Sequence, residues 1–232
     1  MATNPDPLIS QDMRAARAHA YESAREEVQA LVPPGVRRVL DLGCSSGALG
    51  AALKARDGAE VVGVELNQEY ADKAAGRLDR VIVADLDELA SRDDLEATLG
   101  RFDCLIAADV LEHLRDPWTV LARFVTLVDP GGAVIVSLPN VRFWETFWML
   151  GRHGTFPRAR QGLFDETHLR WFTLYDAIGL LDQAGVQYDA VHREIRLGRH
   201  YHEGRDKRRW LLEHSPLRSF FTYQHVVRGR RR

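Results

Sequence analysis

Short apolar segments alternate with segments of helical periodicity along most of this chain, and this alternation constrains the fold more than any other feature. Five apolar segments are rich in aliphatic residues, as strands buried on both faces of a sheet are. They span residues 36–41, 60–65, 80–85, 102–109 and 133–138. Strands that alternate with helices form a parallel sheet covered by helices on both faces. The sequence therefore predicts a doubly wound α/β fold whose ligand lies at the carboxyl ends of the strands.

The 232 residues are predicted to form one domain with four parts. Residues 11–32 have helical periodicity and stop at Pro-Pro-Gly, and residues 36–138 form the predicted ligand-binding core. Residues 139–172 hold three of the five tryptophans and five of the nine phenylalanines without a clear period. We interpret this segment as a cover over the substrate, with a small second core as the alternative. Residues 173–232 resume the α/β pattern and complete the predicted sheet.

Composition and charge narrow the functional classes. The formal net charge is −2, which does not favour nucleic acid as a partner. The segment from 199 to 232 holds ten basic and three acidic residues. We expect the charge of its terminal arginines, Arg228 and 230–232, to be solvated and disordered. The N-terminus lacks the features of a signal peptide, and no apolar run approaches the roughly 18 residues of a membrane span. With Cys44 and Cys104 expected as buried thiols, the sequence predicts a cytoplasmic protein.

Residues 39–47, VLDLGCSSG, have the pattern of a strand, a glycine turn and the start of a helix. Gly43 and Gly47 let a ligand approach the backbone closely, and Glu65, at the end of the next strand, can accept hydrogen bonds from two ribose hydroxyls. Asp85 and Asp109 end two further strands. Each acid could instead cap a helix. Together they predict a carboxylate-rich crevice, which disfavours a polyphosphate and favours a nucleoside that carries positive charge.

Two other nucleotide-binding motifs do not match this turn. A P-loop has Lys and then Ser or Thr after its last glycine, whereas Ala48 and Leu49 follow Gly47. The dinucleotide pattern G-x-G-x-x-G lacks its central glycine here, so a nicotinamide-dependent oxidoreductase is the weaker alternative. S-adenosylmethionine fits the turn and the acidic crevice best.

Five ordered motifs carry a family resemblance: VLDLGCSSGALGAAL, VVGVE, VIVAD, FDCLIAADVLEHLRDP and GGAVIVSLPN. In this order they resemble class I S-adenosylmethionine-dependent methyltransferases. More narrowly, the chain is similar to the small-molecule branch that includes ubiquinone-biosynthesis O-methyltransferases and methyltransferases of cell-surface or secondary-metabolite sugars. LFDETHLRWFTLYDAIGLLDQAG also resembles this branch, so the similarity covers about Tyr21 to Gly185. The resemblance implies a seven-stranded Rossmann-like sheet whose antiparallel last strand, FFTYQHVVR, lies beside VQYDAVH.

The resemblance also implies S-adenosylmethionine as cofactor, S-adenosylhomocysteine as product, and a set of cofactor-binding residues. Asp41 and the glycine turn would line the methionine and ribose part, Glu65 would hold the ribose, and Asp85 with Leu86 would frame the adenine. The full set is Tyr21, Asp41, Gly43, Ser45, Gly47, Glu65, Leu66, Asp85, Leu86 and Asp109. Tyr21 would close over the cofactor or serve as a core tyrosine. Ser45 replaces the usual middle glycine, and a positive φ there would cost about 1 kcal/mol.

Asp109, Glu112 and His113 form D-x-x-E-H, which resembles an acidic and histidine metal motif of the ubiquinone-pathway enzymes. Their spacing predicts that all three lie on one face of a helical turn. Mg²⁺ prefers oxygen ligands, so the histidine disfavours a magnesium site and favours a hydrogen-bonded or pocket-lining role.

His168 is the candidate general base, because a neutral imidazole can take the proton of a hydroxyl acceptor near pH 7. The alternative is a partly buried histidine that fixes its loop. Arg142 and Arg170 are candidates to contact an anionic or glycosyl acceptor, although most arginines are solvated.

The sequence therefore predicts an S-adenosylmethionine-dependent methyltransferase of a small molecule. A hydroxyl is the expected acceptor, with a sugar or glycan precursor as one candidate, since aromatic residues suit sugar rings. The alternatives are an amine or carboxylate acceptor, or an inactive module that keeps the cofactor site. Glu112, His113 and His168 are the predicted catalytic candidates.

Overall fold

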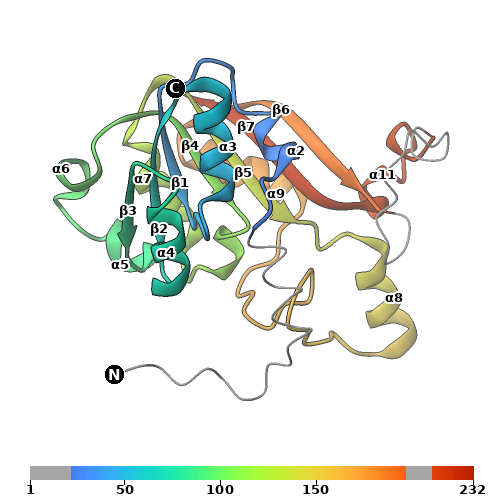
Figure 1. Cartoon of the computed structure of the whole chain (residues 1–232). Helices are drawn as coiled ribbons and strands as arrows, with labels where there is room; N and C mark the ends of the chain where they lie inside the picture. The colour runs from blue at the N-terminus through green and yellow to red at the C-terminus, as the bar shows by residue number, and fades with distance from the viewer. Residues whose placement is uncertain (1–21, 197–210) are drawn as a thin grey trace, which may run out of the picture.

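The computed structural model describes residues 22–196 and 211–232. Its centre is a seven-stranded sheet with the order β3-β2-β1-β4-β5-β7-β6 (Figure 1). Strands β1 to β5 pair in parallel, and β7 runs antiparallel to both β5 and β6. The strands are β1 Arg38–Leu42, β2 Glu60–Glu65, β3 Arg80–Val83, β4 Phe102–Ala108, β5 Val128–Pro139, β6 Val186–Ile195 and β7 Thr222–Arg231. The predicted α/β fold with an antiparallel last strand is confirmed.

Helices cover both faces of this sheet. They are α2 Glu26–Gln29, α3 Ala48–Asp57, α4 Gln68–Ala75, α5 Leu86–Ala90, α6 Leu95–Leu99, the 3₁₀ turn η1 Leu111–His113, α7 Pro117–Val125, α8 Trp144–His153, α9 Leu174–Gln183 and α11 Arg218–Phe221. Successive strand residues point to opposite faces, so Leu40 joins a core beneath α5, α7 and α9, while Val39 joins a core beneath α2, α3 and α4. Within the described ranges, no helix has the length and apolarity needed to cross a membrane.

Two predicted helices differ from the structure. The helix expected over 11–32 is not continuous, because Arg25 has a left-handed φ of 51° and helix begins only at α2. Residues 11–21 lie outside the described residues. The single helix expected over 87–99 is two short helices, α5 and α6. The Ser91 hydroxyl closes α5 by donating to the Glu88 carbonyl, and Arg92 pairs with Asp94 between the helices.

The basic C-terminus is also different from the expectation of a solvated, disordered end. Residues 222–231 form β7 in the interior of the sheet, between β5 and β6. Arg228 and Arg230 both pair with Asp189 of β6. Val226 and Val227 are buried, so burial of the strand outweighs the terminal charge.

Candidate active site

The turn after β1 brings three left-handed residues together at the carboxyl ends of the strands. Gly43, Ser45 and Gly47 have φ values of 69°, 49° and 78°. A Cβ atom at Gly43 would lie 2.8 Å from Val110 Cγ2, so only glycine fits there without movement. Ser45 has the positive φ that the sequence analysis considered, at a cost of about 1 kcal/mol. The turn therefore keeps a tight left-handed backbone at the carboxyl end of β1, where ligands of parallel sheets bind.

Glu65 lies at the end of β2 with its carboxylate held in place from two sides. One oxygen accepts a hydrogen bond from the Ser45 backbone N–H at 2.8 Å, and the other accepts from the Asn67 N–H at 2.8 Å. A carboxylate fixed in this way keeps free lone pairs that can accept hydrogen bonds from ribose hydroxyls. The neighbouring Leu66 is 67% exposed and offers an apolar surface beside it.

Asp41 is buried at the end of β1, close to this carboxylate. Burial and the charge of Glu65 raise the pKa of Asp41 to about 7, while the charge of Arg25 opposes the shift. Two neighbouring acids that repel each other in this way are stabilised by a cation. The residues present therefore fit the positively charged cofactor that the sequence predicts.

Asp85 and Leu86 stand at the start of α5. Asp85 caps this helix by accepting from the backbone N–H groups of Asp87 at 2.8 Å and Glu88 at 3.4 Å. Leu86 is buried. Asp85 therefore caps a helix, which was the alternative to adenine binding. A contact of Asp85 with adenine stays a prediction.

Asp109 directly follows β4 with a left-handed φ of 54° and is therefore not part of a helical turn. Its carboxylate is bound by the side chains of Arg25 and Gln224. The same two side chains donate to the Ser137 hydroxyl, at 3.2 Å and 2.8 Å. Sequence reasoning missed Arg25 and Gln224, since neither belongs to a motif. The expectation that Asp109 shares a helical face with Glu112 and His113 is wrong.

Glu112 instead lies beside His168. Glu112 Oε1 is 3.9 Å from His168 Nε2, and the two side chains are 1% and 6% exposed. Burial and the charge of Asp109 raise the pKa of Glu112 well above its usual value. Burial and the charge of His113 lower the pKa of His168, so its imidazole is neutral at pH 7. Glu112 Oε2 is buried, and no described residue forms a hydrogen bond with it.

His113 completes this cluster from the other side. Its ring packs edge-on against that of His168 at 4.7 Å between centroids, and its Nδ1 lies 3.0 Å from the Thr167 hydroxyl. Among the described residues, one cluster of side chains could hold a metal ion. It consists of Glu112, His113 and His168, whose possible ligand atoms all lie within 4.8 Å of one another. One carboxylate and two imidazoles suit a transition metal, and they fit Mg²⁺ poorly.

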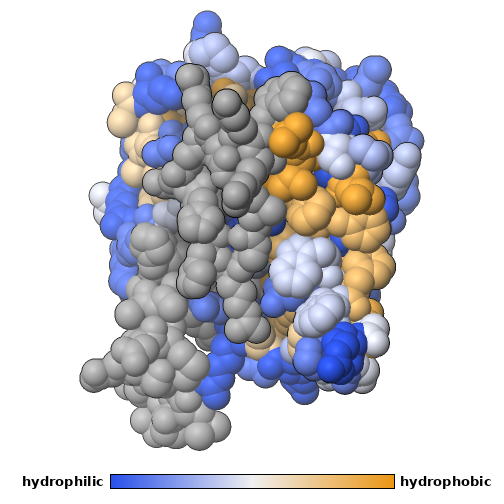
Figure 2. All heavy atoms as spheres, turned by 90° about the vertical axis from the view of Figure 1, so that its right-hand side faces the viewer, coloured by the Kyte–Doolittle hydropathy of each residue, from blue (hydrophilic) through white to orange (hydrophobic). Residues whose placement is uncertain are grey.

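The segment 139–172 packs against the carboxyl end of β5 and the amino end of β7, which lie side by side because the two strands are antiparallel. Phe143, Leu163 and Phe164 form a small core of their own, joined by Tyr223 of β7. Helix α8 exposes several large side chains, namely Phe147, Trp148 and Leu150. Figure 2 views the side of the molecule that carries α8 and α11, and apolar residues gather on that face. The second-core interpretation therefore describes part of the segment, and its role as a substrate cover stays a prediction.

Three further candidates are placed as follows. Tyr21 lies outside the described residues. Arg170 donates to the carbonyls of Arg115 and Leu169, which occupies its guanidinium. The Arg142 guanidinium lies 5.3 Å from the centre of the Phe220 ring.

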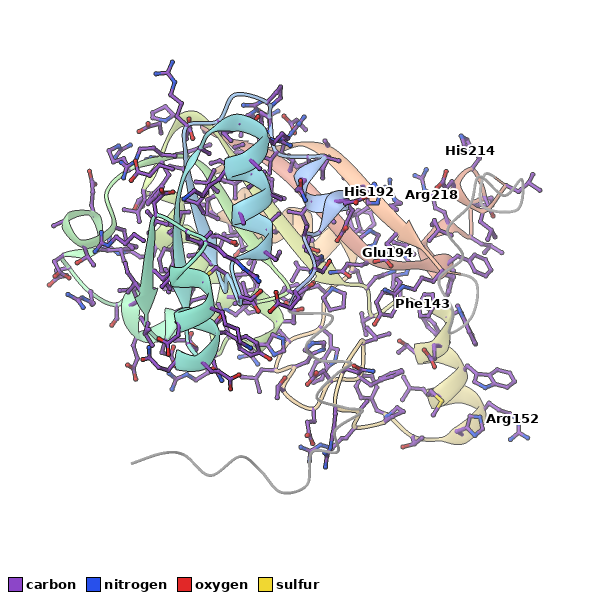
Figure 3. All side chains as sticks on the ribbon, viewed as in Figure 1. Phe143, Arg152, His192, Glu194, His214 and Arg218 are labelled. Carbon is purple, nitrogen blue, oxygen red and sulfur yellow. The ribbon has the colours of Figure 1, made fainter. Side chains whose placement is uncertain are left out.

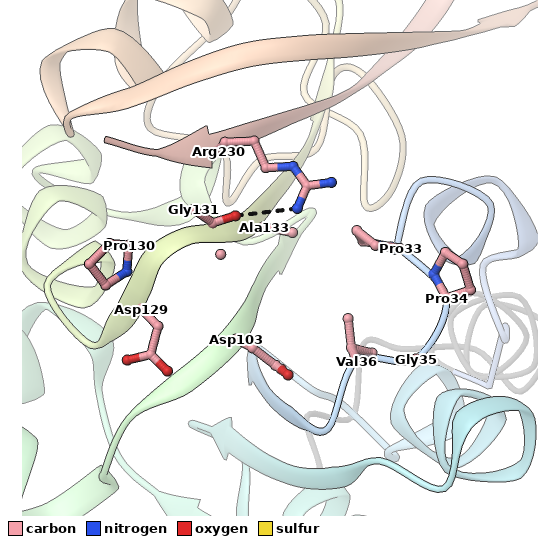
Figure 4. Close-up of a pocket in the computed structure, with 11 residues that line it drawn as sticks. Pro33, Pro34, Gly35, Val36, Asp103, Asp129, Pro130, Gly131, Ala133 and Arg230 are labelled. Atoms are coloured by element: carbon pink, nitrogen blue, oxygen red, sulfur yellow. Dashed lines mark hydrogen bonds between the residues drawn. The ribbon is translucent and has the colours of Figure 1, made fainter.

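A surface hollow at the opposite edge of the sheet is separate from this site (Figure 4). It lies at the amino ends of β1, β4 and β5, between Pro34, Asp103, Pro130 and Arg230. Asp103 accepts hydrogen bonds from the backbone of Arg37 and Arg38, so its carboxylate holds the start of β1. Ligands of parallel sheets bind at the carboxyl ends, where the glycine turn lies.

The sequence model of the methyltransferase domain family matches residues 14–191. The chain belongs to this family. It is an S-adenosylmethionine-dependent methyltransferase, and the turn after β1 with Glu65 and Asp41 provides residues that fit the cofactor.

The methyltransferase is similar to curated enzymes and to solved structures. The ubiquinone biosynthesis O-methyltransferase of Aeromonas salmonicida is 29% identical over 174 residues, which cover 70% of this chain and 71% of that protein. The enzyme of the same name from Ralstonia nicotianae is 34% identical over 111 residues, or 47% of this chain and 46% of that protein.

Solved structures share the fold at low sequence identity. A methyltransferase of Thermotoga maritima, described as a possible histamine N-methyltransferase, has a TM-score of 0.64 and 19% identity, covering 97% of this chain and 96% of that one. The magnesium protoporphyrin IX methyltransferase of Synechocystis, solved with bound S-adenosylhomocysteine, has a TM-score of 0.62 and 18% identity, covering 98% and 90%. Both comparisons support the methyltransferase fold.

Proposed function

We propose that this methyltransferase transfers the methyl group to a hydroxyl of a small-molecule acceptor and that His168 takes the hydroxyl proton. The observation that carries the proposal is the buried pair of Glu112 and His168 beside Asp109, at the carboxyl edge of the sheet. The curated relatives named O-methyltransferases support the same acceptor chemistry.

When bound, the cofactor supplies an activated methyl group with its leaving group already in place. Alignment of the acceptor then provides much of the rate acceleration. A hydroxyl must in addition lose its proton, and the neutral imidazole of His168 is suited to accept it. His168 Nδ1 lies 3.3 Å from the Leu163 carbonyl, which can fix the ring with Nε2 facing Glu112. The raised pKa of Glu112 favours its protonated form, so Glu112 borders this nitrogen of His168 without supplying a full negative charge.

A glycosyl acceptor is the more specific form of this proposal. Trp144 and Met149 line the core of the segment 139–172, and Phe147 and Trp148 are exposed on α8. Aromatic faces of this kind suit sugar rings. We place the enzyme in the cytoplasm, where its free thiols Cys44 and Cys104 stay reduced.

The test is radiolabelled methyl transfer to three probes: catechol as a phenol, glucose 1-phosphate as a sugar, and histamine as an amine. We expect transfer to a hydroxyl probe and a loss of about 100-fold or more in His168→Gln. His192→Gln, on the edge strand β6 and outside the segment 139–172, is the matched control and keeps the wild-type rate.

Binding of S-adenosylhomocysteine by both variants, measured calorimetrically, shows that the cofactor site is intact. Transfer to histamine alone would contradict the hydroxyl acceptor. A wild-type rate for His168→Gln from pH 6 to 9 would remove His168 as the base. Cofactor binding without transfer to any probe would favour an inactive module.

A further inference from the structure

Four basic residues lie near the carboxyl end of β5 and the adjoining ends of β6 and β7. His225 of β7 lies between Leu138 of β5 and Arg193 of β6 in the sheet register. Arg142 follows β5, and Arg218 begins α11. The charges of Arg193 and Arg142 act on His225, and the charge of Arg218 acts on Arg193. Figure 3 shows Arg218 and His192 on this side of the molecule, away from Arg152 at the end of α8.

These arginines lack counter-charges among the described residues. No ion pair or side-chain hydrogen bond joins the guanidinium of Arg142, Arg193 or Arg218 to a residue in 22–196 or 211–232. The nearby carboxylate of Glu194 is engaged by Arg196 at 2.7 Å. Burial and the charge of Arg218 lower the pKa of Arg193, which is the direction expected of a cation without a partner. By contrast, Arg228 on the same sheet has a carboxylate partner in Asp189.

His225 gives a second and independent sign of a ligand. His225 is 3% exposed, and its Nδ1 is buried with no hydrogen-bond partner among residues 22–196 and 211–232. Burial, Arg193 and Arg142 lower the pKa of His225 to about 4, so the ring is neutral and keeps one N–H. An unsatisfied buried polar group costs about 1–3 kcal/mol, and such groups in native proteins often indicate a missing partner.

The cluster adjoins the acceptor side of the active site. The Leu163 backbone interacts with the Tyr223 hydroxyl, and its carbonyl also lies 3.3 Å from His168 Nδ1. Tyr223 and His225 are two residues apart near the amino end of β7. The cofactor turn, with its acidic residues, is at β1 and β2 in the other half of the sheet. An anion is therefore disfavoured there and favoured at this cluster.

We propose that Arg142, Arg193, Arg218 and His225 form a binding site for an oxyanion, and that this oxyanion is a phosphoryl group of the acceptor. Guanidinium groups bind phosphoryl oxygens in a bidentate manner. Three guanidinium groups suit a doubly charged phosphoryl ligand better than they suit a singly charged carboxylate ligand. The acceptor is then a phosphorylated small molecule that also carries the hydroxyl. This assignment rests on the proposed function, since it places the anion on the same acceptor.

Calorimetric titration of the full chain tests the site without turnover. The probes are inorganic pyrophosphate, glucose 1-phosphate, its uncharged counterpart methyl glucoside, and malonate as a carboxylate. We expect pyrophosphate and glucose 1-phosphate to bind, malonate to bind more weakly, and methyl glucoside not to bind measurably. Removing one charge by Arg193→Gln or Arg142→Gln should weaken phosphate binding about tenfold or more.

Arg152→Gln, which removes an exposed charge on α8 outside the cluster, is the control and should bind the phosphates as the wild type does. Binding of S-adenosylhomocysteine reports that each variant is folded. Equal phosphate affinity in the wild type and in both cluster variants would overturn the site, as would absence of binding at millimolar pyrophosphate. Tighter binding of malonate than of glucose 1-phosphate would overturn the phosphoryl assignment. A failure of the proposed function is detected by a different measurement: His168→Gln would then transfer methyl groups at the wild-type rate.

Discussion

Arg25 and Asp109 form an ion pair between two left-handed residues that lie 84 positions apart in the sequence. Arg25 precedes the first residue of α2, and Asp109 directly follows β4. The pair therefore joins the first described segment to the edge of the sheet that holds the site. Gln224 and Ser137 complete the network from β7 and β5. Cofactor and acceptor sides of the enzyme thus share one set of polar contacts.

Removing the Arg25 charge should destabilise the enzyme. In Arg25→Met, the partly buried carboxylate of Asp109 keeps only its contact with Gln224, and we expect a loss of about 1–3 kcal/mol in the free energy of unfolding. Urea denaturation measures it. Arg38→Met, which breaks an exposed pair with Glu60, is the control and should cost about 0–1 kcal/mol. Equal effects of the two substitutions would show that the Arg25 network adds nothing.

Glu65→Ala should lose cofactor affinity while keeping the fold. Two backbone hydrogen bonds hold this carboxylate at the end of β2, and its remaining lone pairs are the predicted ribose acceptors. Loss of charged hydrogen bonds of this type lowers affinity about 10- to 100-fold. Titration with S-adenosylhomocysteine measures the effect. Glu60→Ala removes a carboxylate from the other end of β2 and should bind normally; similar losses in both variants would refute the assignment.

Ser45→Gly should be more stable than Ser45→Ala by about 1 kcal/mol. The φ of 49° is strained for any residue with a Cβ, and alanine keeps that strain while it removes the hydroxyl. Comparing the two variants with each other separates the backbone effect from the loss of side-chain contacts. Urea denaturation of both variants measures the difference, and a more stable alanine variant would contradict the strain.

Local sequence could predict those parts of the site that lie within a single strand and the turn after it. Gly43, Gly47 and Glu65 follow directly from strand ends in a parallel sheet, and the structure places Glu65 against the glycine turn. The strands of the sheet follow from their aliphatic composition. His168 and Glu112 were each named as candidates, but their contact joins two segments of the chain and no spacing rule predicts it.

The parts that sequence reasoning missed depend on long-range register. Arg193 and His225 are paired because β6 and β7 are antiparallel with irregularities in their register, which no short motif specifies. Arg25 was expected within a helix, because its neighbours have helical periodicity. In the structure, Arg25 instead has a left-handed backbone and forms an ion pair with Asp109. The C-terminal arginines were expected to be solvated, because charge near a terminus usually is. Arg228 and Arg230 form ion pairs with Asp189 because β7 pairs with β6 in the sheet.

Asp41 makes both stability and cofactor binding depend on pH. Its folded pKa of about 7 is above the unfolded value of about 3.9, so the folded state binds one more proton between these values. The contribution of Asp41 to stability is therefore full below about pH 4 and is lost as the pH rises towards 7. In Asp41→Asn this loss should be absent. Urea denaturation at several pH values between 4 and 8 measures it.

The positive charge of S-adenosylmethionine should lower the pKa of Asp41, so binding at pH 7 should release a fraction of a proton. Titration in bis-Tris and in Tris buffer gives the number of protons, because the two buffers differ in ionisation enthalpy and neither is an oxyanion. S-adenosylhomocysteine lacks the sulfonium charge and should release fewer, and Asp41→Asn should release fewer with either ligand. Equal apparent enthalpies for S-adenosylmethionine in both buffers would show that Asp41 is already ionised, or that the sulfonium binds elsewhere.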